Sequence, residues 1–201
     1  MISFGRAVAR TTKQALVVLD MPFGSYEISP EQAVESAIML MKQTGAEALK
    51  LEGGTNRIAQ IKAIVAAGIP VMGHLGFTPQ SVHALGGFKV QGRGDSAAEI
   101  ASEARQLQEA GVFALVLEMV PAAVAKQITA ELNIPTIGIG AGNATDGQIL
   151  VWQDFAGLST GSRKFVKQYA SLRNDLLTAA RSYRADVQSS SFPAVEHSFE
   201  D

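Results

Sequence analysis

Polar or charged side chains in this sequence come at the ends of short apolar runs. They are Asp20, Lys50, Glu52, His74 and Glu118. Apolar runs of this length are typical of strands that are buried on both faces of a parallel sheet. In parallel α/β folds, ligands bind at the carboxyl ends of the strands. These side chains are therefore the candidates for chemistry.

Asp20 and Glu52 offer carboxylate oxygens, which are hard donors. On neighbouring strand ends they could hold Mg²⁺, which commonly binds one or two carboxylates and keeps its other positions for water and substrate. Lys50 precedes Glu52 by two residues, so both side chains share one face of a strand. The Lys50 ammonium could neutralise a carboxylate or keto oxygen of the same ligand. Alternatively, it forms a structural ion pair with Asp20 or Glu118.

Glu118 lies between Leu117 and Met119, so its carboxylate has apolar neighbours. Such surroundings favour proton binding by a carboxylate, which suits a general base. The alternative is an acidic side chain that interacts with a helix N-terminus. His74 could hydrogen-bond a substrate, although satisfaction of loop backbone is the more common role. No second histidine lies at ligand spacing, so a zinc site is not expected.

Strand-length apolar runs alternate with segments of helical spacing along the chain. Strands are expected near 15–19, 46–51, 69–74, 112–117, 134–139 and 148–151. Helices are expected near 3–13, 30–44, 56–67, 96–110, 121–132 and 164–186. The alternation predicts βαβ units and a parallel sheet, in a (β/α) barrel or a doubly wound sheet. About six units are present, whereas a closed barrel has eight.

Between these elements, the glycine-rich stretch 75–94 is expected to be a long functional loop. Asp95 is expected to cap the helix that follows. Residues 1–201 are expected to form a single, partial barrel domain whose tail, 188–201, is irregular.

The composition favours a compact enzyme. The chain has 201 residues, 47% of them hydrophobic, and a formal net charge of −2. This charge gives no electrostatic footprint for nucleic acid or an anionic membrane. The sequence contains no cysteine, which excludes disulfides and a thiol nucleophile. No apolar run reaches the roughly 18 residues that span a bilayer.

Longer motifs resemble those of the ketopantoate hydroxymethyltransferases. The matching stretches, in order, are residues 20–23 (DMPF), 50–54 (KLEGG), 73–80 (GHLGFTPQ), 86–93 (GGFKVQGR), 137–142 (IGIGAG) and 196–199 (EHSF). The resemblance implies a (β/α)₈ TIM barrel of the phosphoenolpyruvate/pyruvate type, assembled as a homo-oligomer, usually a decamer. It also implies a cytoplasmic or organellar enzyme of pantothenate biosynthesis.

The implied reaction transfers a hydroxymethyl group from 5,10-methylenetetrahydrofolate to 3-methyl-2-oxobutanoate and gives 2-dehydropantoate through a Mg²⁺-stabilised enolate. Carried over by the resemblance, Asp20 binds metal and substrate, Glu52 binds metal and Lys50 binds substrate. Glu118 removes the C3 proton, and His74 remains a possible site residue. The alternative chemistry is a Mg²⁺-dependent lyase of the same barrel group that acts on a 2-oxo acid.

One feature departs from the family pattern. The family has two earlier strands, and the second ends in Gly-Asp-Ser, whose aspartate binds metal and whose serine touches substrate. The only such triplet here is Gly94-Asp95-Ser96, which lies in the wrong segment. The expectation is therefore a barrel that is N-terminally truncated to about six βα units. An inactive fragment, or a non-catalytic remnant that serves in assembly, is the corresponding alternative.

Overall fold

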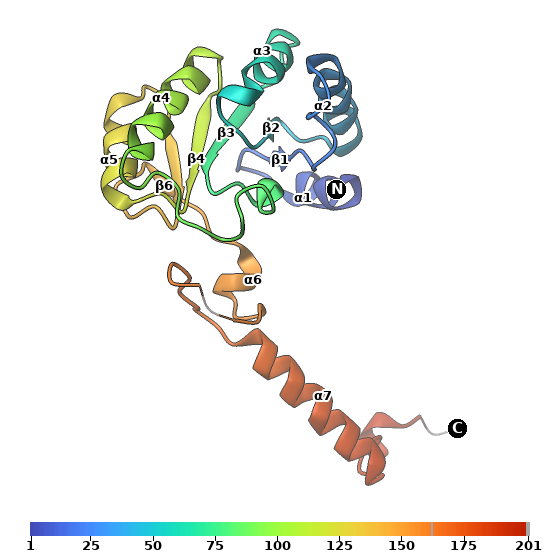
Figure 1. The fold of residues 1–201 in the computed structure, drawn as a ribbon. Helices are drawn as coiled ribbons and strands as arrows, with labels where there is room; N and C mark the ends of the chain where they lie inside the picture. Colours follow the sequence, from blue (N-terminus) through green and yellow to red (C-terminus); the bar gives the residue numbers. More distant parts are fainter. Residues whose placement is uncertain (162, 200–201) are drawn as a thin grey trace. The chain divides into compact units, whose positions relative to one another are not determined.

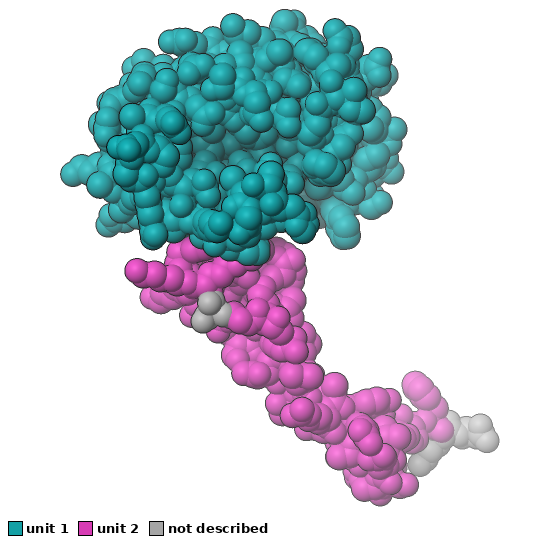
Figure 2. All heavy atoms as spheres, in the orientation of Figure 1, with its two compact units in different colours: residues 1–149 teal, residues 150–201 magenta. Residues whose placement is uncertain are grey.

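The structure is a computed structural model of the 201-residue chain. It describes residues 1–161 and 163–199. The chain forms two compact units, residues 1–149 and residues 150–201, which Figure 2 shows in different colours. All of the predicted site residues belong to the first unit.

The first unit is built on a parallel sheet. Its strands are β1 (Val18–Asp20), β2 (Ala48–Lys50), β3 (Val71–Gly76), β4 (Ala114–Glu118), β5 (Thr136–Ile139) and β6 (Gly147–Gln148). The strands are hydrogen-bonded in chain order, β1 to β6, and every neighbouring pair is parallel. A doubly wound sheet would reverse its order, so the sheet is part of a barrel wall. The predicted alternation and the count of six strands are confirmed.

Helices connect the strands and lie around the outside of the curved sheet (Figure 1). They are α1 (Ile2–Thr11), α2 (Pro30–Thr44), α3 (Ile58–Ala66), α4 (Ser96–Glu109) and α5 (Ala122–Glu131), with short 3₁₀ turns η1 (Thr55–Arg57) and η2 (Pro79–Ser81). The sequence sets these limits locally. Before α2, the Ser29 hydroxyl accepts a hydrogen bond from the Gln32 amide at 3.2 Å, and Gly45 ends the helix with φ +76°.

Asp95 corrects one expectation. It occupies the cap position before α4, but its side chain makes no capping hydrogen bond. Its own backbone is helical (φ −62°, ψ −29°), whereas a capping residue is normally extended. The Ser96 hydroxyl instead donates to the Arg93 carbonyl at 2.8 Å.

The strands separate an apolar face from a polar one. Leu49 and Leu51 are fully buried in the core, together with helix residues such as Ile61 and Ile64. Because successive strand residues point to opposite faces, Lys50 and Glu52 lie on the other face. The helices thus pack against the outer face of the sheet at β2, and Lys50 and Glu52 lie on its inner face.

The second unit contains α6 (Trp152–Phe155), α7 (Leu172–Gln188) and the 3₁₀ turn η3 (Val195–His197). The helix expected from residue 164 begins only at Leu172. Before it, the Tyr169 amide donates to the carbonyl of Phe155, the last residue of α6. Residues 200–201 of the expected tail lie outside the described residues. Within the described chain, none of the helices combines the length and apolar character that a bilayer crossing needs.

Asp146 stabilises the start of β5 and gives a prediction about acid stability. Its Oδ2 accepts hydrogen bonds from the Thr136 backbone amide at 2.8 Å and from the Thr136 hydroxyl at 3.1 Å. These bonds lower the pKa of Asp146. A carboxylate with a lowered folded-state pKa stabilises the fold above its unfolded pKa of about 3.9, and this contribution is lost as the pH falls through the folded-state pKa.

We therefore expect Asp146→Asn, which keeps the shape but cannot titrate, to unfold at lower urea concentration than the parent at pH 6. At pH 3 the difference between the two midpoints should shrink. Urea titrations followed by circular dichroism at both pH values measure it. An equal difference at both pH values would contradict the assignment.

Candidate functional site

The structure brings the predicted side chains together at the carboxyl ends of β1 to β4. The Lys50 ammonium is central: its Nζ lies 2.8 Å from Asp20 Oδ1, 3.6 Å from Glu52 Oε1 and 3.1 Å from His74 Nδ1. We call Asp20, Lys50, Glu52, His74 and Glu118 the strand-end cluster. In this cluster the Lys50 ammonium lies between the carboxylates of Asp20 and Glu52 and also contacts the His74 ring.

His74 connects this group to Glu118. Its Nε2 lies 3.4 Å from Glu118 Oε2, and its Nδ1 lies 3.8 Å from Glu52 Oε1. A lysine ammonium only donates hydrogen bonds, so the Nδ1 that faces Lys50 is the acceptor of the ring. The ring proton of neutral His74 then sits on Nε2 and points towards the Glu118 carboxylate. The His74 side chain therefore contacts other side chains of the strand-end cluster. The role expected from the sequence as the more common one was a hydrogen bond to loop backbone.

Most of the strand-end cluster is shielded from water. Glu52, His74 and Glu118 are 5%, 3% and 6% exposed, whereas the Asp20 side chain is 42% exposed. Two buried atoms, Asp20 Oδ1 and His74 Nε2, have no hydrogen bond of good geometry within the described residues, although each has a polar neighbour nearby. Buried polar atoms are normally satisfied. These two are therefore positions at which a ligand could add a hydrogen bond.

The oxygen donors of Asp20 and Glu52 suit a Mg²⁺ ion. Within the described residues, no group of three or more His, Cys, Asp and Glu side chains is arranged to hold a metal. A cation here would rest on these two carboxylates, and Mg²⁺ commonly takes only one or two and keeps several waters. The pair already attracts one positive charge, the Lys50 ammonium. Asp20 Oδ1, which is buried and faces the Lys50 ammonium at 2.8 Å, is the oxygen that such an ion would contact.

The backbone around Glu118 is held by three strand ends. The Glu118 carbonyl accepts from the Phe77 amide at 2.8 Å, and the Met119 amide donates to the Ile139 carbonyl at 2.9 Å. A Cβ at Gly76 would overlap the Glu118 carbonyl, so a side chain there would displace Glu118. Met119 itself has φ +49°, in the left-handed region. Strained backbone of this kind clusters at functional sites.

Met119 therefore gives a prediction. A side chain in this conformation costs about 1–2 kcal/mol, and a β-branched one is tolerated worst. Met119→Gly should leave the free energy of unfolding near the parent value, because lost packing offsets relieved strain. Met119→Val should lower it by about 1–2 kcal/mol. Urea denaturation of both variants measures this, and equal stability of the two would contradict the role of φ.

Two further residues of the site were not predicted from the sequence. Tyr26, in the loop after β1, and Gln80, in η2, form a hydrogen-bond network with Glu52. Gln80 lies six residues after His74 and ends the motif GHLGFTPQ, which was the available signal. The sequence around Tyr26 offered no comparable motif, because Tyr26 lies in an irregular loop.

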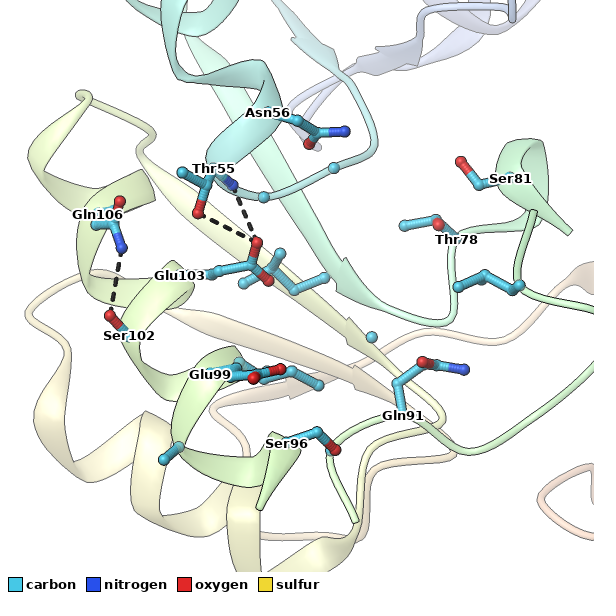
Figure 3. A pocket seen from close by; sticks show the side chains of 18 of the residues that line it. Thr55, Asn56, Thr78, Ser81, Gln91, Ser96, Glu99, Ser102, Glu103 and Gln106 are labelled. Carbon is cyan, nitrogen blue, oxygen red and sulfur yellow. Dashed lines mark hydrogen bonds between the residues drawn. The ribbon is translucent and has the colours of Figure 1, made fainter. Parts of the chain in front are cut away.

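A cavity of about 820 Å³ adjoins the strand ends (Figure 3). Gly53, Gly54 and Gly76 line it, but no residue of the strand-end cluster does. Glu103 projects from α4 at its edge, where its carboxylate accepts from the Thr55 amide at 3.1 Å. The candidate site is the strand-end cluster and not this cavity, because the buried charges and unsatisfied atoms lie in the cluster. Two glutamates line the cavity, Glu99 and Glu103, and Glu103 is already bound to the loop that follows Glu52.

Solved structures with the same fold include phosphonopyruvate hydrolase. It matches with a TM-score of 0.56 and 15% identity, over 100% of this chain and 70% of that chain. A putative phosphonomutase from Burkholderia cenocepacia J2315 matches with a TM-score of 0.56 and 16% identity, over 94% of this chain and 75% of that chain. At this identity the likeness concerns the fold alone. It supports the expected barrel fold.

Sequence relatives are much closer. A 3-methyl-2-oxobutanoate hydroxymethyltransferase of Thermobifida fusca (strain YX) is 58% identical over 200 residues, covering 99% of this chain and 71% of that protein. A protein of the same name from Corynebacterium glutamicum is 56% identical, covering 99% of this chain and 74% of that protein. The sequence model of the ketopantoate hydroxymethyltransferase family matches residues 1–195. The chain therefore belongs to the ketopantoate hydroxymethyltransferase family.

Proposed function

We propose that this protein transfers a hydroxymethyl group from 5,10-methylenetetrahydrofolate to 3-methyl-2-oxobutanoate, giving 2-dehydropantoate. The relatives that cover nearly the whole chain carry the name of this reaction. The observation that carries the proposal is the strand-end cluster. It sets a buried carboxylate, Glu118, 3.4 Å from one ring nitrogen of His74, whose other ring nitrogen faces the Lys50 ammonium that pairs with Asp20 and Glu52.

The substrate has two neighbouring oxygen-bearing groups that the site must recognise, a carboxylate and a keto carbonyl. The Lys50 ammonium binds these oxygens, because it is the positive group of the strand-end cluster and is only 16% exposed. Asp20 and Glu52 would hold Mg²⁺. When bound, the ion acts as a Lewis acid that polarises the keto group and makes the C3 proton more acidic.

Glu118 removes that proton. Its carboxylate is buried at the end of β4, where water competes little for the proton. His74 Nε2 lies 3.4 Å from Glu118 Oε2, so the ring packs against the base on the side of the strand-end cluster. The C3 carbon, freed of its proton, then forms the new bond to the one-carbon unit. That unit leaves both folate nitrogens as their C–N bonds break, one water supplies its hydroxyl group, and tetrahydrofolate is released. The backbone bonds at Phe77 and Met119 keep Glu118 in place during this step.

We also propose that the protein works as a cytoplasmic homo-oligomer. Helix α7 has no buried residue, yet Leu172, Leu176, Tyr183 and Val187 form an exposed apolar stripe along one side of it. A second copy of the chain would cover such a stripe. Sedimentation velocity measures the assembly, and a monomer at micromolar concentration would contradict it.

The function is tested in two steps. The first follows exchange of the C3 proton of 3-methyl-2-oxobutanoate in D₂O with Mg²⁺ but no folate. The second adds 5,10-methylenetetrahydrofolate and measures 2-dehydropantoate by mass spectrometry. We expect Mg²⁺-dependent exchange in the first and product in the second. Folded, Mg²⁺-loaded protein that catalyses neither would overturn the proposal.

A further inference from the structure

Gln80 touches both strand ends that carry the cation-binding carboxylates. Its backbone amide donates to Glu52 Oε2 at 2.9 Å. Its side-chain Nε2 donates to the carbonyl of Met21, the residue after Asp20, at 2.9 Å. One residue of η2 therefore bonds to the carboxylate of Glu52 and to the backbone next to Asp20.

Tyr26 fixes the orientation of the Gln80 side chain. The Tyr26 hydroxyl donates to Gln80 Oε1 at 2.8 Å, which leaves Nε2 facing Met21. The same hydroxyl oxygen accepts a hydrogen bond from the Glu52 backbone amide at 3.3 Å. Tyr26 is only 1% exposed. Burial raises the pKa of Tyr26, so the hydroxyl stays protonated and able to donate.

These contacts form a closed ring. It runs from the Glu52 amide to the Tyr26 hydroxyl, on to the Gln80 side chain, and back from the Gln80 amide to the Glu52 carboxylate. Both the main chain and the side chain of Glu52 are thus restrained. Through Met21, whose amide donates to the Lys50 carbonyl at 2.8 Å, the ring is also joined to the end of β1.

We propose that Gln80, oriented by Tyr26, is a positioning residue that sets the separation of the Asp20 and Glu52 carboxylates for a divalent cation. Gln80 and Tyr26 act through the carboxylates and the adjoining backbone. Replacing a residue that hydrogen-bonds to a metal ligand commonly changes the metal affinity by about 10–100-fold. The inference rests on the proposed function for the role of the two carboxylates.

The position requires an amide side chain. It accepts from Tyr26 with one atom and donates to Met21 with the other, and an amide offers both in one rigid plane. Leucine fills a similar volume but makes neither bond. Glutamate would set a carboxylate against the Met21 carbonyl and add a negative charge close to Glu52. The backbone bond from residue 80 to Glu52 remains in every variant, so the variants test the side chain alone.

The test measures binding of Mn²⁺, a spectroscopic substitute for Mg²⁺, to the full chain by electron paramagnetic resonance of the free ion. We expect Gln80→Leu and Tyr26→Phe to weaken Mn²⁺ binding by about 10–100-fold. The double variant Tyr26→Phe/Gln80→Leu should lose less than the two single losses combined, because the Tyr26 hydroxyl acts partly through the Gln80 side chain and partly on the Glu52 amide.

Gln91→Leu is the matched control. Gln91 lies in the same long loop, and its side chain donates to the Lys89 carbonyl at 3.0 Å, not to a strand end of the cluster. Its Mn²⁺ affinity should equal that of the parent. Equal affinity in Tyr26→Phe and the parent, an equal loss in Gln91→Leu, or a parent that binds no Mn²⁺ would each overturn the inference.

A second readout separates this inference from the proposed function. If the parent binds Mn²⁺ and the variants do not, the positioning role of Gln80 is supported. This remains so even if the parent fails to exchange the C3 proton, a result that would contradict the proposed function alone. If Gln80→Leu does not fold, as judged by circular dichroism, Tyr26→Phe alone decides, because it removes one oxygen atom.

Discussion

Replacing Glu118 with glutamine should slow exchange of the C3 proton of 3-methyl-2-oxobutanoate by about 10²–10⁴-fold, the usual contribution of a general base. Glutamine has nearly the same shape and keeps a carbonyl oxygen that can face His74 Nε2, the atom that lies 3.4 Å from the Glu118 carboxylate. It cannot take up a proton. The loss should therefore appear in the exchange rate, whereas Mn²⁺ affinity should stay near the parent value, because Glu118 contacts neither Asp20 nor Glu52.

Glu131→Gln is the matched control for this substitution. Glu131 lies at the end of α5 and pairs with Arg105 on the surface, away from the strand-end cluster. Its exchange rate should equal that of the parent. The decay of the C3 proton signal in D₂O by nuclear magnetic resonance measures all three proteins. An exchange rate for Glu118→Gln equal to the parent rate would remove Glu118 as the base.

The strand ends could be predicted from the sequence because two signals coincide there. An apolar run indicates a buried strand, and a charged residue cannot remain in that core, so it marks the point where the strand leaves it. Asp20 and Glu118 are indeed the last residues of β1 and β4. Because the strands are parallel and ordered along the chain, their charged ends had to meet. Local pattern and topology together account for the strand-end cluster.

The hydrogen bonds and backbone conformation that hold the strand-end cluster could not be predicted, because they depend on contacts between segments that are distant in the sequence. Tyr26 and Gln80 are 54 residues apart and meet only through the curvature of the sheet. The left-handed backbone of Met119 follows from its bond to Ile139, not from its side chain. Local pattern was also insufficient before α7, where the Tyr169 amide donates to the Phe155 carbonyl of α6.

Lys50→Met should destabilise the protein and increase the shift of its unfolding midpoint when Mg²⁺ is added. The Lys50 ammonium is the cation nearest to Glu52, whose side chain is only 4% exposed. Breaking a buried ion pair commonly costs 3–5 kcal/mol, and the half-exposed Asp20 moderates the loss here, so we expect a decrease of about 2–4 kcal/mol in the free energy of unfolding. Urea titrations without Mg²⁺ measure it. Lys62→Met, an exposed substitution of the same kind on α3, should change stability by less than about 0.5 kcal/mol.

Addition of Mg²⁺ distinguishes this ion pair from an ordinary structural one. In the parent, a divalent ion must share the Asp20 and Glu52 carboxylates with the Lys50 ammonium. In Lys50→Met these carboxylates have lost their nearest cation, so Mg²⁺ should raise the unfolding midpoint of this variant more than that of the parent or of Lys62→Met. Its catalysis should stay low, because the substrate oxygens have lost their ammonium partner. A Lys50→Met protein as stable as Lys62→Met and indifferent to Mg²⁺ would show that the two carboxylates need no cation.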